Sequence, residues 1–186
     1  DIPNQYGNPE PVRVKRFHDD FNSFRASAEA GIINRRWADL FSITLNGAFV
    51  DKDIQHNLIM TQPYGKARTQ SDNKAVYLKW RSNAVLKNTS LNFFTGYNQE
   101  HSQLIDSALN AYTWDGKIAN RRSYGGEFSA IQTNLKLKAH QVLSRFNASY
   151  SKDNINSVNF NIVHSYFTQN GMDDFSQDYY GEDIYE

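Results

Sequence analysis

Aromatic side chains in long polar segments are the strongest candidates for ligand recognition. Tyr64 lies in residues 51–74, and Tyr112 and Trp114 lie in residues 98–124. Both segments are rich in Asn, Gln and Asp, and neither keeps the regular pattern of a strand or helix. Aromatic faces beside amide and carboxylate groups suit the binding of a sugar or a metal chelate. Tyr64, Tyr112 and Trp114 are therefore the predicted ligand-binding residues.

The residues that usually carry catalysis or bind metals do not occur at the required spacing. No H-x-x-x-H pair is present, and a polar loop explains His18-Asp19-Asp20 as well as a cation site does. Asp51-Lys52-Asp53 begins like a calcium loop but lacks its glycine and closing glutamate. Gly125-Gly126 lacks the pattern of a phosphate-binding loop, and no Gly-x-Ser-x-Gly sequence occurs. We expect no catalytic residue, no metal, no cofactor and no enzymatic activity.

The composition favours strands with one wet face and one apolar face. The chain has 186 residues, a formal net charge of zero and no cysteine. A zero net charge gives no general attraction to nucleic acid, so no nucleic-acid partner is expected. Hydrophobic residues make up only 39%, yet 11 Tyr and 12 Phe are present. Such a polar, aromatic-rich chain is typical of β-strands that turn one face to water and the other to an apolar medium.

Period-two alternation begins after Asp20 and predicts about seven antiparallel strands between residues 21 and 167. The pattern is clearest in residues 38–50, where Phe41, Ile43, Leu45, Gly47 and Phe49 share one face. The predicted strands are residues 22–33, 38–50, 75–83, 91–97, 127–138, 142–150 and 158–167. Residues 1–20 are predicted to form an N-terminal loop, and residues 168–186 an acidic loop or tail.

The connections between the predicted strands alternate between short and long. Short turns are expected at 34–37, 86–90 and 139–141, and long loops at 51–74 and 98–124. Outer-membrane barrels have short turns on one side of the membrane and long loops on the other. Strands of about 9–11 residues are long enough to cross a bilayer when tilted. The sequence therefore predicts an all-β, antiparallel up-and-down meander that is part of an outer-membrane β-barrel.

The polar faces of these strands are expected to line a water-filled lumen. Lys79, Arg81, Lys136, Lys138 and Arg145 are all assigned to that side, because a charge facing lipid would cost about 2–4 kcal/mol. Aromatic residues are expected to face the membrane or its borders. These are Trp37, Trp80, Tyr97 and Tyr124, and a border position is also open for Tyr112 and Trp114.

Seven strands are too few for a bacterial barrel, which has eight or more and an even count. Either an eighth strand lies in the tails, or the chain is a fragment of a larger barrel. The tails are rich in proline or acidic residues, so we expect a fragment that needs the rest of the barrel.

Several short motifs, taken in order, resemble the TonB-dependent receptors of the Bacteroidetes type. The similarity covers most of residues 13–175. The motifs are RFHDDFNS at 16–23, WADLF at 37–41, DKDIQ at 51–55, YGKA at 64–67, YTWDGK at 112–117 and NGMDD at 170–174.

This resemblance implies a wall segment of a barrel of about 22 strands with a plugged lumen. It also implies location in the cell outer membrane and uptake of a scarce ligand such as an iron chelate, a cobalamin or a glycan. The implied partners are membrane lipid, the rest of the barrel, a plug domain, and TonB through a part that this sequence does not contain. The alternatives are a small soluble barrel that binds an apolar ligand, as lipocalins do, and a β-sheet hydrolase or surface lectin.

Overall fold

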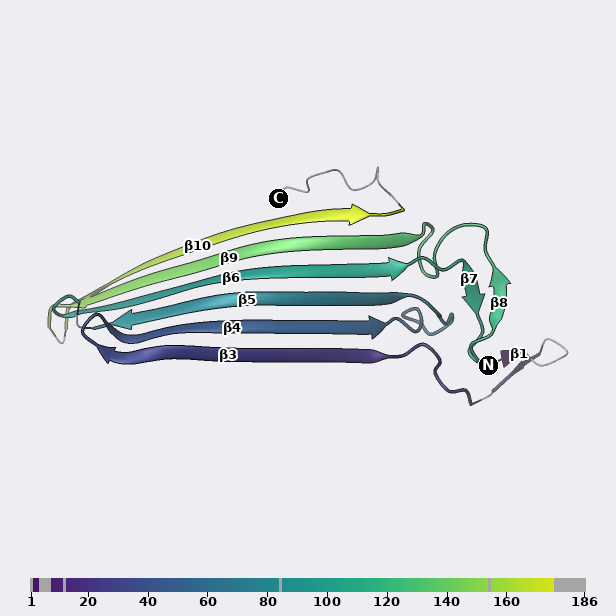
Figure 1. Ribbon diagram of the computed structural model, residues 1–186, viewed down its shortest axis with the longest axis horizontal. Helices are drawn as coiled ribbons and strands as arrows, with labels where there is room; N and C mark the ends of the chain where they lie inside the picture. Colours follow the sequence, from purple (N-terminus) through teal and green to yellow (C-terminus); the bar gives the residue numbers. More distant parts are fainter. Residues whose placement is uncertain (1, 4–7, 12, 84, 154, 176–186) are drawn as a thin grey trace.

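The main body of the protein is one antiparallel sheet of six long strands (Figure 1). This computed structural model describes residues 2–3, 8–11, 13–83, 85–153 and 155–175. The spatial order of the strands is β10-β9-β6-β5-β4-β3. They are β3 (Phe21–Arg35), β4 (Ala38–Asp53), β5 (Arg68–Ser82), β6 (Thr89–Asp106), β9 (Thr133–Ser151) and β10 (Ser157–Asp173).

Two short strand pairs lie outside this sheet. β1 (Ile2–Pro3) pairs with β2 (Pro9–Glu10), within the region predicted as an N-terminal loop. β7 (Asn110–Tyr112) pairs with β8 (Ile118–Arg121) and forms a hairpin inside a long connection (Figure 1). Among the described residues, no helix has the length and hydropathy that spanning a bilayer requires.

The connections follow the predicted short–long rhythm, and the all-β antiparallel meander is confirmed. β3–β4, β5–β6 and β9–β10 are joined by short turns that gather at one end of the sheet (Figure 1). The long connections, residues 54–67 and 107–132, lie at the opposite end. Asn34 (φ 56°) and Asn88 (φ 57°) take the left-handed conformation at two of the turns, which asparagine tolerates better than most residues.

The predicted turn at 139–141 is wrong, and the sheet has six strands rather than about seven. Ala139 lies inside β9, paired with Glu100 of β6 on one side and Gln169 of β10 on the other. The apolar positions change from odd to even numbers there, from Leu137 to Val142, which suggested a turn. In the structure the strand continues, and the apolar side chains move to the other face.

The same error misplaced two lysines. Lys136 and Lys138 were assigned to the same face as Arg145, but an even and an odd position of one continuous strand lie on opposite faces. Cross-strand pairing aligns Lys138 with His101, Asp72 and Phe49. Both lysines therefore lie on the face that carries the apolar residues.

The sheet is a single layer, and no helix or second sheet covers either face in the described part of the chain (Figure 1). We call the side that carries Phe41, Ile43 and Leu45 the apolar face, and the other side the polar face. Ile43 is 41% exposed and Leu45 58% exposed. Among the described residues the buried apolar side chains are Ala38, Tyr64, Ala67 and Ala75. The sheet therefore has no hydrophobic core of its own.

Apolar side chains form a diagonal band across the apolar face. On β4 the band runs from Phe41 to Phe49, and on β9 it runs from Val142 to Tyr150. Pairing through β5 and β6 aligns Phe41, the turn-side end of the belt on β4, with Phe146 of β9. The turn-side end of the belt on β9 is Tyr150, four residues farther along. The band is thus displaced by four residues between these strands, toward the short turns. We call it the apolar belt; it also includes Phe24, Ile32, Val76, Leu78, Trp80, Leu91, Phe93, Tyr97, Val158, Phe160, Ile162 and Tyr166.

The polar face carries charged and amide side chains at the level of the belt. Asn92, Asn147 and Asn161 form a ladder across three strands, with N···O distances of 3.4 and 2.6 Å. Glu29 accepts a hydrogen bond from Ser42 at 2.7 Å and lies 3.4 Å from the Lys79 ammonium. This face is therefore suited to water, while the belt is not.

Gly96 provides a test of packing on the polar face. A Cβ at this position would stand 2.5 Å from the Tyr77 ring, whereas a Cβ at Gly47 would meet nothing within 4 Å. We expect Gly96→Val to lower the free energy of unfolding by about 1–3 kcal/mol, because the ring must be displaced. Urea titration measures this change. Gly47→Val is the matched control and should stay within about 0.5 kcal/mol of the original chain. Equal effects of the two substitutions would contradict the described contact.

Candidate functional site

The long connections at one end of the sheet bring together the side chains that can recognise a ligand. Residues 54–67 follow β4, and residues 107–132, which contain the β7–β8 hairpin, follow β6 (Figure 1). Buried carboxylates join these two loops.

Asp106, the last residue of β6, is fully buried and holds the second loop in place. Its carboxylate accepts hydrogen bonds from the backbone N–H groups of Glu127, Phe128 (3.2 Å) and Ser129 (3.0 Å). Gly126 lies so close to this carboxylate that a Cβ there would clash with it. Gly125-Gly126 thus helps to form a backbone cradle, which holds a carboxylate of the chain itself.

Glu127 extends this connection to the first loop. Its side chain is almost fully buried, and its carboxylate accepts hydrogen bonds from the N–H groups of Gly65 (2.6 Å), Lys66 (2.8 Å) and Ala67 (2.6 Å). The Gln62 amide donates to the Glu127 carbonyl at 3.2 Å. Asp106 at the end of β6 therefore fixes the loop 107–132, and Glu127 in that loop fixes the loop 54–67.

Tyr64 lies inside this cluster. It is 4% exposed, and its ring centroid is 5.7 Å from that of Phe128. Burial raises the pKa of its phenol, and the negative charges of Asp106 and Glu127 raise it further. The ring contributes to loop packing, and little of it can be reached from solvent.

A cavity of about 640 Å³ opens beside the cluster and includes Tyr112 in its wall. The Tyr112 ring lies over Gly65 and 5.9 Å from the Phe17 ring, which fixes its orientation. Lys66 and Arg68 bring positive charge to the wall. His18, Asp53 and Asn110 also line the cavity.

His18 connects the start of β3 to this cavity. Its Nδ1 lies 3.0 Å from the Asp53 carboxylate, and its Nε2 lies 2.6 Å from the Ala67 carbonyl. The Asp53 carboxylate and the Ala67 carbonyl are both hydrogen-bond acceptors, so the two contacts fix the orientation of the ring. Asp53 also accepts a hydrogen bond from the Asp20 N–H at 3.1 Å.

The structure separates the predicted ligand-binding residues. Tyr112 lines the cavity, Tyr64 is buried, and Trp114 lies near the tip of the β7–β8 hairpin, 6.1 Å from the His56 ring. A role of these residues in ligand binding stays a prediction, and Tyr112 is the best placed of them. Of the predicted border residues, Tyr97 lies on the apolar face with its hydroxyl 2.6 Å from His140 Nδ1, and Tyr124 is 77% exposed in the second loop.

This arrangement is suited to holding a small polar molecule. Lys66 and Arg68 can pair with a carboxylate or phosphate, and Tyr112 offers a ring face to a sugar or chelate. The described residues contain no group of three or more His, Asp or Glu side chains arranged to hold a metal ion. Comparison with protein-family models, with curated proteins and with solved structures found no match.

Glu127→Gln tests the connection between the loops. An amide keeps one acceptor oxygen but turns an NH₂ group toward backbone N–H donors, so we expect a loss of about 1–3 kcal/mol in local stability. Amide hydrogen exchange at Gly65 and Ala67 measures this loss. Glu100→Gln is the matched control, because Glu100 is exposed on β6 and its carboxylate accepts no hydrogen bond from the described residues. Unchanged protection in Glu127→Gln would refute the described connection.

The β7–β8 hairpin is expected to depend on pH through Asp115. The Lys117 ammonium at 2.7 Å and the Thr113 hydroxyl lower the pKa of this carboxyl from 3.8 to about 2. A lowered pKa stabilises the folded hairpin above pH 4, and this contribution is lost as the pH falls through 2. Carboxyl NMR should place the midpoint near 2, and Lys117→Met should move it toward 3.8. The Asp153 carboxyl, in another turn, should not respond to Lys117→Met; a shift there, or none at Asp115, would contradict the assignment.

Proposed function

We propose that this sheet is a wall segment of an outer-membrane β-barrel, in a receptor of the TonB-dependent kind that takes up a scarce ligand. The ligand classes are an iron chelate, a cobalamin or a glycan. The observation that carries the proposal is the apolar belt, which lies uncovered on one face of a single-layer sheet. Exposed apolar surface of this extent favours contact with lipid or with another protein.

The height of the belt agrees with the apolar layer of a membrane. It covers eight residue steps on β4 and eight on β9, which is about 26 Å along a strand at about 3.3 Å per residue. For strands tilted by about 40°, this becomes about 20 Å along the membrane normal, and side chains at both borders extend it further. Outer-membrane barrels carry an apolar band of about 25 Å.

The diagonal course of the belt agrees with strands that are tilted in a membrane. Its displacement of four residues is about 13 Å along the strands, and the three strand spacings from β4 to β9 make about 14 Å across the sheet. A level membrane border requires a tilt of about 40° across these strands but about 30° across all six, because β3 and β10 widen the sheet without displacing the belt further. Strands of barrels are tilted by about 35–45°. A sheet that packs on a protein layer has no such requirement.

In a membrane, the two edge strands of the sheet would need further strands to pair with. β3 and β10 each pair on one side only among the described residues. Hydrocarbon offers no partner for backbone N–H and C=O groups, so a sheet can cross a bilayer only when its edges are paired. Six strands are fewer than the eight of the smallest barrels, so additional strands are needed for closure.

In this proposal the loop end faces the outside and captures the ligand. The cavity beside Tyr112 lies at that end, and the positions of Lys66 and Arg68 favour a ligand that carries an anionic group. The polar face, with Lys79, Arg81 and Arg145, lines the lumen, where a plug domain and TonB would act through other parts of the transporter. No step of this uptake is chemical, so the sheet needs no catalytic residue.

Adjacent residues of β6 test whether the belt contacts lipid. Phe93 lies in the belt and Asn92 lies on the opposite face. The chain has no cysteine, so Phe93→Cys and Asn92→Cys each provide a unique site for a spin label. In vesicles, we expect the label at 93 to be accessible to oxygen, which concentrates in lipid, and shielded from a water-soluble nickel chelate. The label at 92 should show the opposite preference.

Other outcomes would point to the alternatives. A label at 93 that is shielded from both reagents indicates a covered apolar face, as in a soluble lipocalin-like barrel. A label at 93 that is accessible to the nickel chelate indicates a sheet that stays in water. Either result would refute the proposed contact with lipid.

A further inference from the structure

We propose that the polar face carries, at the height of the apolar belt, a docking surface for an acidic surface of the protein domain that fills the lumen. We call this docking surface the basic patch and define it by Tyr77, Lys79, Arg81, Phe94 and Arg145. The inference rests on the proposed function and deepens it, because it requires the polar face to line a lumen.

The register of the sheet places the basic patch directly behind the belt. Lys79 and Arg145 lie in one cross-strand row with Phe94 between them, so two strand spacings separate them by about 10 Å. Arg81 follows Lys79 by two residues on the same face of β5, and Trp80 between them belongs to the belt on the other face. In the proposed barrel, lipid therefore covers the back of the patch, and its charges can meet partners only from the lumen.

The positive charge of the patch is only partly balanced within the sheet. The Lys79 ammonium lies 3.4 Å from the Glu29 carboxylate, whereas the side chains of Arg81 and Arg145 form no hydrogen bond or ion pair with any described residue. The next acidic residue on this face of the described sheet is Glu100, six rows from Lys79, or about 20 Å along the strands. Two positive charges therefore remain without a partner, and carboxylates of another protein surface would pair with them.

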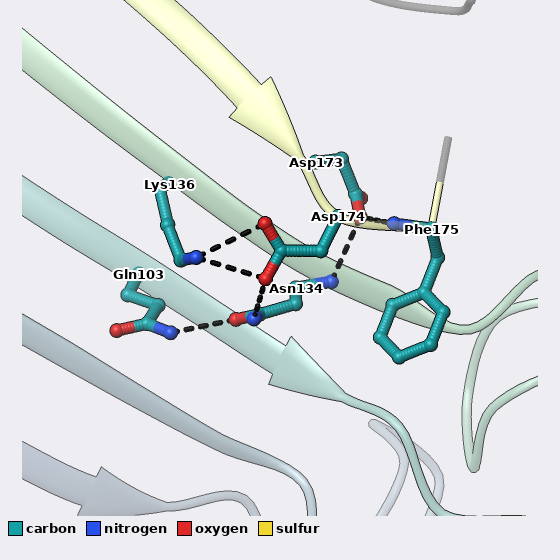
Figure 2. A network of polar contacts seen from close by, with 6 residues as sticks. All are labelled: Gln103, Asn134, Lys136, Asp173, Asp174 and Phe175. Atoms are coloured by element: carbon teal, nitrogen blue, oxygen red, sulfur yellow. Dashed lines mark hydrogen bonds and ion pairs between the residues drawn. The ribbon is translucent and has the colours of Figure 1, made fainter. Parts of the chain in front are cut away.

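The loop end of β9 shows how the chain neutralises a cation with a carboxylate of its own. Lys136 donates to both oxygens of Asp174 at 3.0 and 2.8 Å, and Asn134 donates to the same carboxylate (Figure 2). Gln103 completes this network by donating to Asn134 at 2.6 Å, as Figure 2 shows. Arg145, nine residues farther along β9, has no such carboxylate among the described residues. In the proposed barrel Arg145 lies beside a hydrocarbon layer, where charges are less well screened, so a missing partner costs more there.

The centre of the patch has the composition of a protein interface. The rings of Tyr77 and Phe94 stack beside the cations, with centroids 5.9 Å apart and an angle of 19° between their planes. Aromatic residues and arginine are enriched in protein interfaces, whereas small molecules are usually bound in concave pockets. Lys79 and Arg145 lie on opposite sides of Phe94, about 10 Å apart on the sheet surface. An acidic protein surface can reach both cations, and it is therefore a better fit than a small anion.

The test uses the intact chain in phosphatidylcholine vesicles and a fluorescent deca-glutamate peptide, which presents the carboxylates of an acidic protein surface. Fluorescence anisotropy measures the binding of the peptide. We expect the double variant Arg81→Gln, Arg145→Gln to bind it about 3- to 10-fold more weakly than the original chain, because two charge pairs are lost. The matched control is Lys74→Gln, Lys138→Gln, which removes the same charge from the apolar face and should change binding less than about 1.5-fold. A deca-glutamine peptide should not bind.

The label at position 93 is read in the same vesicles, so the two proposals can fail separately. If the label contacts lipid while both double variants bind deca-glutamate equally well, the basic patch is refuted and the membrane wall stands. Equal binding of deca-glutamine would refute the patch in the same way. Displacement of the peptide by citrate at a lower ionic strength than sodium chloride requires would show a site for a small anion and would also overturn the inference. If the label does not contact lipid, both proposals fail.

Discussion

The structure depends on one constraint: the backbone of each strand is paired by its neighbours, while its side chains have no protein layer to rest on. In a sandwich or a sheet covered by helices, packing decides which face is apolar. Here each face must suit whatever medium lies against it, and the two faces differ. Ile43 and Leu45 remain exposed on one side, whereas Asn92, Asn147 and Asn161 are hydrogen-bonded to each other on the other side. The belt, the amide ladder and the position of the charges all follow from this difference.

The alternation of apolar and polar residues predicted the strands correctly where one face is apolar and the other polar. The strand predicted at residues 38–50 lies within β4, and the short–long order of the connections is as expected. Beyond the belt the apolar residues of β9, such as Leu137, lie on the opposite face, so the parity of apolar residues no longer reports one continuous face. The sequence therefore predicts a turn at 139–141 inside β9 and places Lys138 on the wrong face. A change of parity without a turn residue such as Gly, Pro, Asn or Asp was the signal that the strand continues.

The loop end could be predicted only in part. Its long loops and the aromatic character of Tyr112 are visible in the sequence. The connection through Asp106 and Glu127 is not, because each carboxylate binds backbone N–H groups 21 to 62 residues away in the chain. A lone acidic residue beside a glycine pair has many explanations. Only the folded loops show that these two carboxylates are buried and that Tyr64 is packed against them.

The extra length of the strands has a mechanical consequence. β9 continues for nine residues beyond the belt, from Val142 to Thr133, before its loop begins. In the proposed tilted barrel this makes a rigid collar that reaches about 20 Å above the belt. The rim that carries Tyr112 would then stand above the lipid headgroups. In that arrangement a diffusing ligand would meet the loops before it reaches the membrane surface.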